Sequence, residues 1–129
     1  MNQNYLNTRF KVVVPPEGIP SRFGIVTAHN PDGFRVSDAA NEKAAAELRM
    51  ELMNQNRYFF PVTGGSPDFS HAEEGFGIVM DCADQAVALG RQWRQEAVFW
   101  VEDGTVELWS CTTGKRTVVG PWHDLALES

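Results

Sequence analysis

Most side chains that could bind or transform a small molecule lie in two segments, 27–41 and 64–74, and near residue 95. Amide side chains can orient a polar ligand, and a carboxylate can act as a general base when its pKa is raised. Seven residues are therefore candidates for ligand binding, namely Thr27, Asn30, Asn41, Ser66, Glu73, Arg91 and Gln95. Glu73 is also the candidate for catalysis, although a carboxylate that fixes its own loop by hydrogen bonds is the more common arrangement.

The elements that must position these residues follow from hydrophobic patterning. Two runs, FGIVTA at 23–28 and GFGIVM at 75–80, are continuously apolar and predict interior strands. Ser37 is a suitable N-cap for a helix that extends to about residue 55, with a buried stripe of Asn41, Ala45, Leu48 and Leu52. Further strands are expected at 8–14, 57–63, 97–101 and 105–110, and a second helix from about residue 81 or 84 to 95.

This order predicts a single α+β domain over residues 1–129, with a core at about 8–111 and a loop-rich tail at 112–129 that Trp122 packs down. The middle six elements, β-α-β-β-α-β, match a ferredoxin-like core with strand order 4-1-3-2 and an extra strand at each end. Pro61 places strand 57–63 at the sheet edge, because proline cannot donate to a ladder. An antiparallel or mixed sheet with another strand order is the rival arrangement.

In that topology the 27–41 and 64–74 loops and the end of the second helix share one end of the sheet. The first helix would offer backbone N–H groups and a positive dipole to an anion there. A turn at Gly64-Gly65-Ser66 could add a backbone nest, although a double glycine is more often only a turn. Asn41 has two readings of equal weight, a hydrogen bond that closes the preceding loop and a contact to ligand.

Several other function classes are disfavoured. His71-x-Glu73 with His29 and Asp68 matches no zinc spacing, so no metal site is expected. The chain has no Walker A loop, dinucleotide fingerprint or Gly-x-Ser-x-Gly elbow, so no cofactor is expected. A net charge of −6 and a pI near 4.9 argue against nucleic acid, since phosphate neutralisation needs a basic face.

The cysteine count and the hydropathy bear on cellular location. Cys82 and Cys111 are expected to be free, buried or half-buried thiols in a reducing cytosol. No apolar run approaches the roughly 20 residues of a membrane helix, and the first ten residues lack the pattern of a signal peptide. A cytoplasmic protein without membrane contact is therefore expected.

Several short motifs resemble a small bacterial family catalogued as a domain of unknown function. The matching residues are Tyr5, Thr8 and Phe10; Thr27-Ala28-His29-Asn30-Pro31; Ser37 and Asn41; Glu73 and Phe76; and Leu89-Gly90, Gln95 and Ala97-Val98-Phe99. The family pattern more often has an aromatic residue at position 29 and Pro-Ser after Glu73. This resemblance weakens the case for His29 as a catalytic residue, and it supplies no reaction.

These observations lead to three hypotheses. The first is binding of a small polar or anionic ligand at the shared end of the sheet, with Asn30 and Asn41 orienting it. The alternative is a protein-interaction or regulatory module, including a homodimer, that uses a sheet edge or an exposed sheet face bearing Trp100 and Trp109. The third, a hydrolase or transferase that depends on Glu73, ranks below both.

Overall fold

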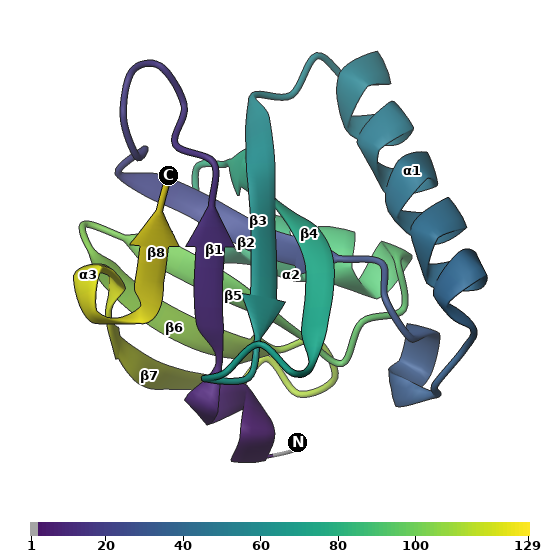
Figure 1. Cartoon of the computed structure of the whole chain (residues 1–129). Coiled ribbons are helices and arrows are strands. Elements are labelled where there is room, and N and C mark those ends of the chain that lie inside the picture. The colour runs from purple at the N-terminus through teal and green to yellow at the C-terminus, as the bar shows by residue number, and fades with distance from the viewer. Residues whose placement is uncertain (1–2) are drawn as a thin grey trace.

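Eight strands form one curled sheet in the computed structural model, which describes residues 3–129 (Figure 1). The sheet order is β7-β6-β5-β2-β4-β3-β1-β8, and every neighbouring pair is antiparallel except β1 and β8. The strands are β1 (Arg9–Val12), β2 (Arg22–Thr27), β3 (Phe59–Gly65), β4 (Ala72–Val79), β5 (Ala97–Glu102), β6 (Thr105–Ser110), β7 (Arg116–Pro121) and β8 (Ala126–Glu128). The helices are α1 (Asp38–Asn54), α2 (Ala83–Gln92) and α3 (Trp122–Leu125), with short 3₁₀ turns η1 (Gln3–Asn7) and η2 (Pro31–Gly33). The mixed α+β class is confirmed.

The four inner strands lie in the order β5-β2-β4-β3, which is the 4-1-3-2 order expected from the sequence. The ferredoxin-like core as such is not confirmed, because the sheet continues by two strands on each side and curls. The helices also differ in their placement. Helix α2 lies across β2 and β5, whereas α1 stands beside β4 (Figure 1).

The prediction that Pro61 marks an edge strand is wrong, since β3 lies between β4 and β1. The pair Val12–Val62 is the last one between β1 and β3, and the Pro61 carbonyl accepts a hydrogen bond from the Val13 N–H at 3.2 Å. A residue's N–H and C=O point to the same side of a strand, so the missing N–H faces β1 beyond its paired positions. Proline therefore costs β3 no hydrogen bond to β4, and on the β1 side it falls just past the last paired position.

The expected 64–74 loop is largely strand. Gly64 and Gly65 pair with Glu73 and Ala72 of β4 and with β1, which leaves a turn at 66–71. Any Cβ on Gly65 would lie 2.6 Å from the Phe69 ring, so the glycine admits that ring against the strand. Gly64 and Gly65 therefore serve a tight hairpin, and both lie in a strand instead of the backbone nest considered as a lesser alternative.

The C-terminal residues form β7, α3 and β8 instead of the expected loop-rich tail. Trp122 does pack them down: its side chain is 6% exposed, stacks on Phe10 at 5.6 Å and meets Phe23 edge-on at 5.3 Å. The β8 strand then adds to β1 in parallel. This long-range pairing leaves no mark in local sequence patterning.

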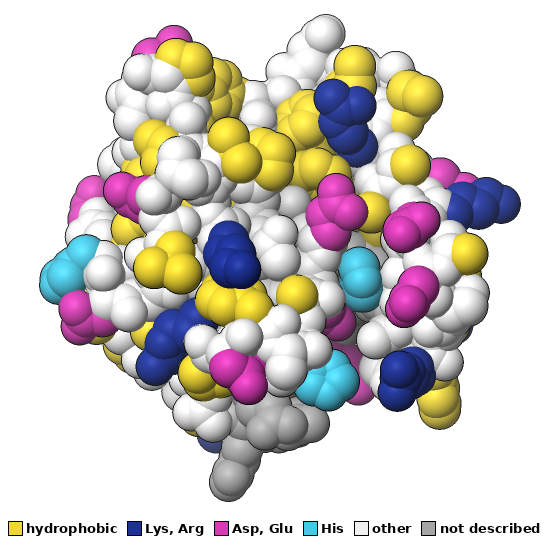
Figure 2. Space-filling view, in the orientation of Figure 1, with side chains coloured by type: hydrophobic (Ala, Val, Ile, Leu, Met, Phe, Trp, Pro, Cys, Tyr) yellow, Lys and Arg dark blue, Asp and Glu magenta, His cyan; other side chains and the backbone are white. Residues whose placement is uncertain are grey.

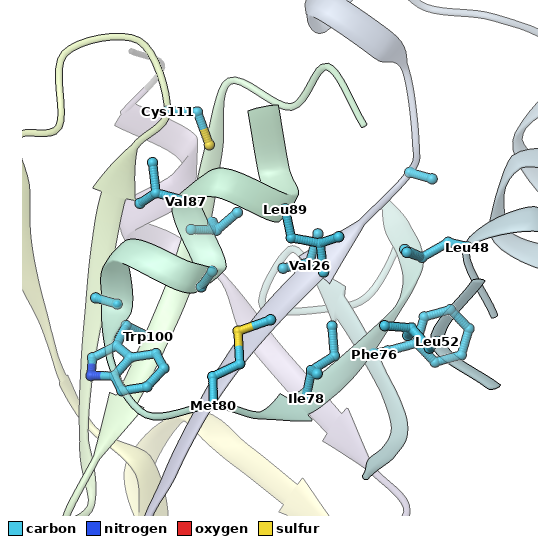
Figure 3. Close-up of a cluster of buried hydrophobic side chains, with 14 residues drawn as sticks. Val26, Leu48, Leu52, Phe76, Ile78, Met80, Val87, Leu89, Trp100 and Cys111 are labelled. Atoms are coloured by element: carbon cyan, nitrogen blue, oxygen red, sulfur yellow. The ribbon is translucent and has the colours of Figure 1, made fainter. Parts of the chain in front are cut away.

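Two buried clusters lie on opposite faces of the sheet. One fills the face that carries Trp122 and Leu125, and the other lies under the two long helices, where Leu48 and Leu52 of α1 meet Phe76 and Ile78 (Figure 3). The stripe predicted for α1 is confirmed, as is its Ser37 N-cap, whose Oγ accepts from the Ala40 N–H at 3.1 Å.

Both faces are thus covered, which bears on the tryptophans and the cysteines. Trp100 is 2% exposed and Trp109 is partly buried, so these rings do not form the exposed sheet face considered above. Cys82 and Cys111 are free as expected, although Cys82 is exposed while Cys111 is buried. None of the described helices is both long and apolar enough to span a bilayer.

Candidate functional site

A pocket of about 390 Å³ lies where η1, the β2–α1 connection, β4 and the residues after α2 meet. Its lining is polar, and we call it the acidic pocket: Tyr5, His29, Asn30, Gly33, Glu73, Gln95 and Glu96. Of the sequence candidates, Asn30, Glu73 and Gln95 line it. In the space-filling view, histidine and acidic side chains gather beside the lower ends of β3 and β4 (Figure 2).

Asn30 and Asn41 are joined by a reciprocal pair of hydrogen bonds. The Asn41 Oδ1 accepts from the Asn30 backbone N–H at 2.9 Å, and its Nδ2 donates to Asn30 Oδ1 at 3.0 Å. Asn30 Oδ1 also accepts from the Val36 N–H, and Asn30 itself adopts a left-handed backbone conformation with φ 44°. Since Asn41 is 5% exposed, it closes the loop and stands behind the pocket wall.

Thr27 and Gln95 form a second such support. Thr27 Oγ1 donates to Gln95 Oε1 at 3.0 Å, and Gln95 Nε2 donates to the backbone carbonyls of His29 and Trp93. Gln95 thus ties the end of β2 to the segment after α2. Thr27 reaches the pocket only through this amide.

An ion pair links the same two segments on the surface. Arg94 bonds to the Asp32 carboxylate, and the Asp32 backbone N–H donates to the Arg94 carbonyl at 2.6 Å. Both residues have positive φ, 57° for Asp32 and 58° for Arg94. Left-handed backbone at non-glycine residues costs free energy, so these contacts hold the pocket's rim in a shape that the chain alone would not favour.

Two sequence candidates lie outside the pocket. The Ser66 hydroxyl donates to Asp68 and accepts from the His71 N–H within its own turn. Arg91 is directed away, since its Nε donates to the Cys111 carbonyl at 2.6 Å. The start of α1 is also absent from the lining, and one of its N–H groups, that of Ala40, donates to Ser37 Oγ.

Three acidic groups approach one another in the pocket. Tyr5 donates its hydroxyl proton to Glu96 Oε2 at 3.4 Å. Burial, followed by the charges of Glu96 and Glu73, raises the pKa of Tyr5 to about 12, so the phenol remains a donor at neutral pH. Burial also raises the pKa of Glu73 above its ordinary value, although the nearby His29 and His71 oppose the shift.

Gly33 makes room for one of these carboxylates. It has φ +78°, which glycine tolerates, and a Cβ at this position would overlap the Glu96 carboxylate. The backbone of η2 therefore lies directly against Glu96. Any larger residue would force that carboxylate to shift.

His29 is the least satisfied polar group of the site. Its Nδ1 is buried, and it has no hydrogen-bond partner among the residues that the structure describes. Buried polar atoms without partners are uncommon in folded proteins and carry a free-energy cost. In the same described residues, no group of three or more His, Cys, Asp or Glu side chains is arranged to hold a metal ion.

Sequence reasoning missed Tyr5, Gly33 and Glu96 as pocket residues, and it set His29 aside. Tyr5 had one signal, its place in the motifs that resemble the family, but no periodicity or spacing linked it to Glu73. Glu96 gave no signal beyond being adjacent to Gln95. Gly33 stands in the sequence Asn-Pro-Asp-Gly, which is typical of a turn and gives no sign of a pocket.

Comparison with known proteins gives a family but no activity. The chain belongs to the family described as "Protein of unknown function (DUF3293)", whose model matches residues 26–98. The match includes Asn30, Asn41, Glu73 and Gln95. No curated protein and no solved structure matches the chain.

Proposed function

We propose that this member of the DUF3293 family binds a small polar molecule in the acidic pocket. The observation that supports this most strongly is the concentration of Tyr5, Glu73 and Glu96 in one pocket, where no ion pair within the described residues engages either carboxylate. A volume of about 390 Å³ suits a metabolite-sized ligand. Charged groups that are partly buried without partners are costly unless a ligand completes them.

In this proposal the pocket residues divide into two roles. Glu73, Glu96 and the Tyr5 hydroxyl contact the ligand, together with the Nδ2 group of Asn30, whose Oδ1 already accepts from Asn41 and Val36. Gln95, Thr27 and Asn41 hold the wall, because their side-chain groups are engaged within the protein. Ser66 and Arg91 have no part in binding.

A second candidate function uses Glu73 as a general base. The raised pKa of Glu73 favours it, because a base whose pKa lies nearer to neutral is better matched to proton transfer. This function predicts that the protein turns over a ligand found by screening. The Glu73→Gln variant should lose this turnover and still bind the ligand. Loss of binding together with turnover would favour the simple binding role.

The interaction module is supported by a different feature, the open edges of β7 and β8. Val118 and Leu127 on these strands are 63% and 61% exposed. If the β7 edge pairs with a second copy of the chain, light scattering should show that Val118→Lys shifts the protein from dimer toward monomer. A wild-type protein that is as monomeric as the variant would exclude the homodimer.

A thermal-shift screen of metabolites tests the main proposal. It compares wild type with Glu73→Gln and with a matched control, Glu47→Gln, whose carboxylate lies on the exposed face of α1. The expected result is a compound that raises the melting temperature of wild type and Glu47→Gln and leaves Glu73→Gln unchanged. A library without hits, or hits that persist in Glu73→Gln, would contradict the proposal.

A further inference from the structure

We infer that the ligand of the acidic pocket presents a positively charged nitrogen group, a guanidinium or an ammonium, to Glu73 and Glu96. This inference rests on the proposed function and names the chemical class of its ligand. It departs from the anionic ligand that the sequence allowed, and it is carried by the arrangement of charge around the pocket.

The lining contains two carboxylates and neither lysine nor arginine. The two arginines near this end of α2 are committed elsewhere: Arg94 to Asp32, and Arg91 to the Cys111 carbonyl. A bound anion would face the charges of Glu73 and Glu96 with His29 as the one basic side chain of the lining. Like charges at close range in a partly buried site repel strongly, so an anion is disfavoured.

The donors and acceptors of the pocket suit a cation as well. Ionised carboxylates only accept hydrogen bonds, and a guanidinium offers five donors in a planar fork while an ammonium offers three. Glu73 and Glu96 come from different elements, β4 and the segment before β5, so a cation between them would join both sides of the pocket. The Tyr5 hydroxyl already donates to Glu96 and fixes one of its oxygens.

Gly33 adds a geometric argument. Because η2 presents bare backbone at this position, Glu96 is held against it while its carboxylate remains part of the lining. Glu96 is thereby positioned before any ligand arrives. A preorganised carboxylate loses little conformational entropy on binding, which favours recognition of a small cation.

Three probes test the inference: n-butylguanidinium, its neutral isostere n-butylurea and the anion pentanoate, which is shorter by one atom. Each is titrated into ¹⁵N-labelled wild type, and amide shifts are followed at the pocket residues. We expect n-butylguanidinium to bind about tenfold more tightly than n-butylurea and pentanoate to produce no shifts there. Glu96→Gln and Glu73→Gln should each weaken the cation about tenfold, whereas Glu47→Gln should not.

The outcomes separate this inference from the proposed function. Equal or tighter binding of n-butylurea or pentanoate at the pocket overturns the cationic class and leaves small-molecule binding intact. Absence of pocket shifts with n-butylguanidinium overturns the inference, and the metabolite screen then decides the proposed function alone. The amide spectrum of each variant shows whether it retains the wild-type fold, and Glu96→Asp, which keeps the charge, should bind more tightly than Glu96→Gln.

Discussion

Two acidic hollows of similar size, both formed by described residues, differ in how their carboxylates are satisfied. The second hollow, about 340 Å³, lies at the start of α2; we call it the paired hollow, and it is lined by Cys82, Ala83, Asp84, Trp100, Glu102, Asp103, Thr105, Glu107, Trp109 and Arg116. There the Trp100 and Trp109 indole N–H groups donate to Glu102 and Glu107, each at 3.2 Å, and Arg116 pairs with Glu107 at 3.3 Å.

The contrast shows that acidity alone does not identify a binding site. In the paired hollow, indoles and a guanidinium from neighbouring strand positions serve Glu102 and Glu107, while Asp84 and Asp103 are exposed to solvent. In the acidic pocket, neither Glu73 nor Glu96 has an ion-pair partner within the described residues. Glu96 accepts a hydrogen bond from the neutral Tyr5 hydroxyl. The polar groups that are fully engaged there, Asn41 and Gln95, form the supporting wall.

The largest effect is expected from Asn41→Ala, which removes the support behind the pocket. It breaks both hydrogen bonds to Asn30 and strands a backbone N–H, so unfolding free energy should fall by about 2 kcal/mol, and ligand binding should be lost. Urea denaturation measures the change. Ser37→Ala, which removes only the N-cap of α1, is the control and should cost about 1 kcal/mol without affecting binding. Equal costs and retained binding in both would show that the Asn30–Asn41 pair does not shape the pocket.

Gly33→Ala should come next. Its Cβ would meet the Glu96 carboxylate, and its φ of +78° disfavours alanine, so we expect a loss of about 1–2 kcal/mol together with weakened ligand binding. Gly104→Ala is the matched control, because Gly104 has φ +81° but no atom near its Cβ position. It should lose comparable stability and keep binding. If Gly33→Ala bound normally, the position of Glu96 would be irrelevant to recognition.

Arg116→Gln tests the comparison in the paired hollow, because it removes the cation that pairs with Glu107. The pair with Glu107 is largely exposed at Arg116, so stability should fall by less than about 1 kcal/mol. Glu107 then loses its cation, and n-butylguanidinium should begin to shift the Trp109 indole resonance, which it leaves unmoved in wild type. No response of that indole in the variant would mean that an unpaired carboxylate is insufficient to attract a cation.

The smallest effect concerns Glu73 in the unliganded protein. Burial raises the folded-state pKa of Glu73, so its charged form destabilises the folded protein. This destabilisation is fully present above the folded-state pKa, and it disappears as the pH falls below the pKa of the unfolded state. Glu73→Gln should therefore melt slightly higher than wild type at pH 7, and the gain should shrink toward pH 4. If Glu73→Gln melted below wild type at pH 7, the charged form of Glu73 would be stabilised by its surroundings, contrary to this account.

The fold could be predicted where the signal is local. The apolar runs, the Ser37 cap and the stripe from Asn41 to Leu52 gave the inner strands and α1, and element order gave their arrangement. The course of the chain after residue 111 depended on pairing between β8 and β1, which are distant in sequence. Pro61 misled for a related reason, because proline's cost depends on which side of the strand its nitrogen faces.

The candidate site was predictable to the extent that it lies at the ends of recognisable elements. Asn30, Glu73 and Gln95 fall there, and they line the pocket. Ser66 and Arg91 occupy similar positions, but local contacts draw their side chains away. Tyr5 and Glu96 could not be assigned, because 91 positions of sequence separate two groups that meet only after the sheet has curled.

A crystal structure with n-butylguanidinium tests the central claim most directly, namely that half-buried carboxylates left without an ion-pair partner mark the binding site. We predict that the guanidinium lies in the acidic pocket between Glu73 and Glu96, near the Tyr5 hydroxyl, with the paired hollow unoccupied. An empty acidic pocket, or a guanidinium seated beside Glu102 and Glu107, would contradict this account.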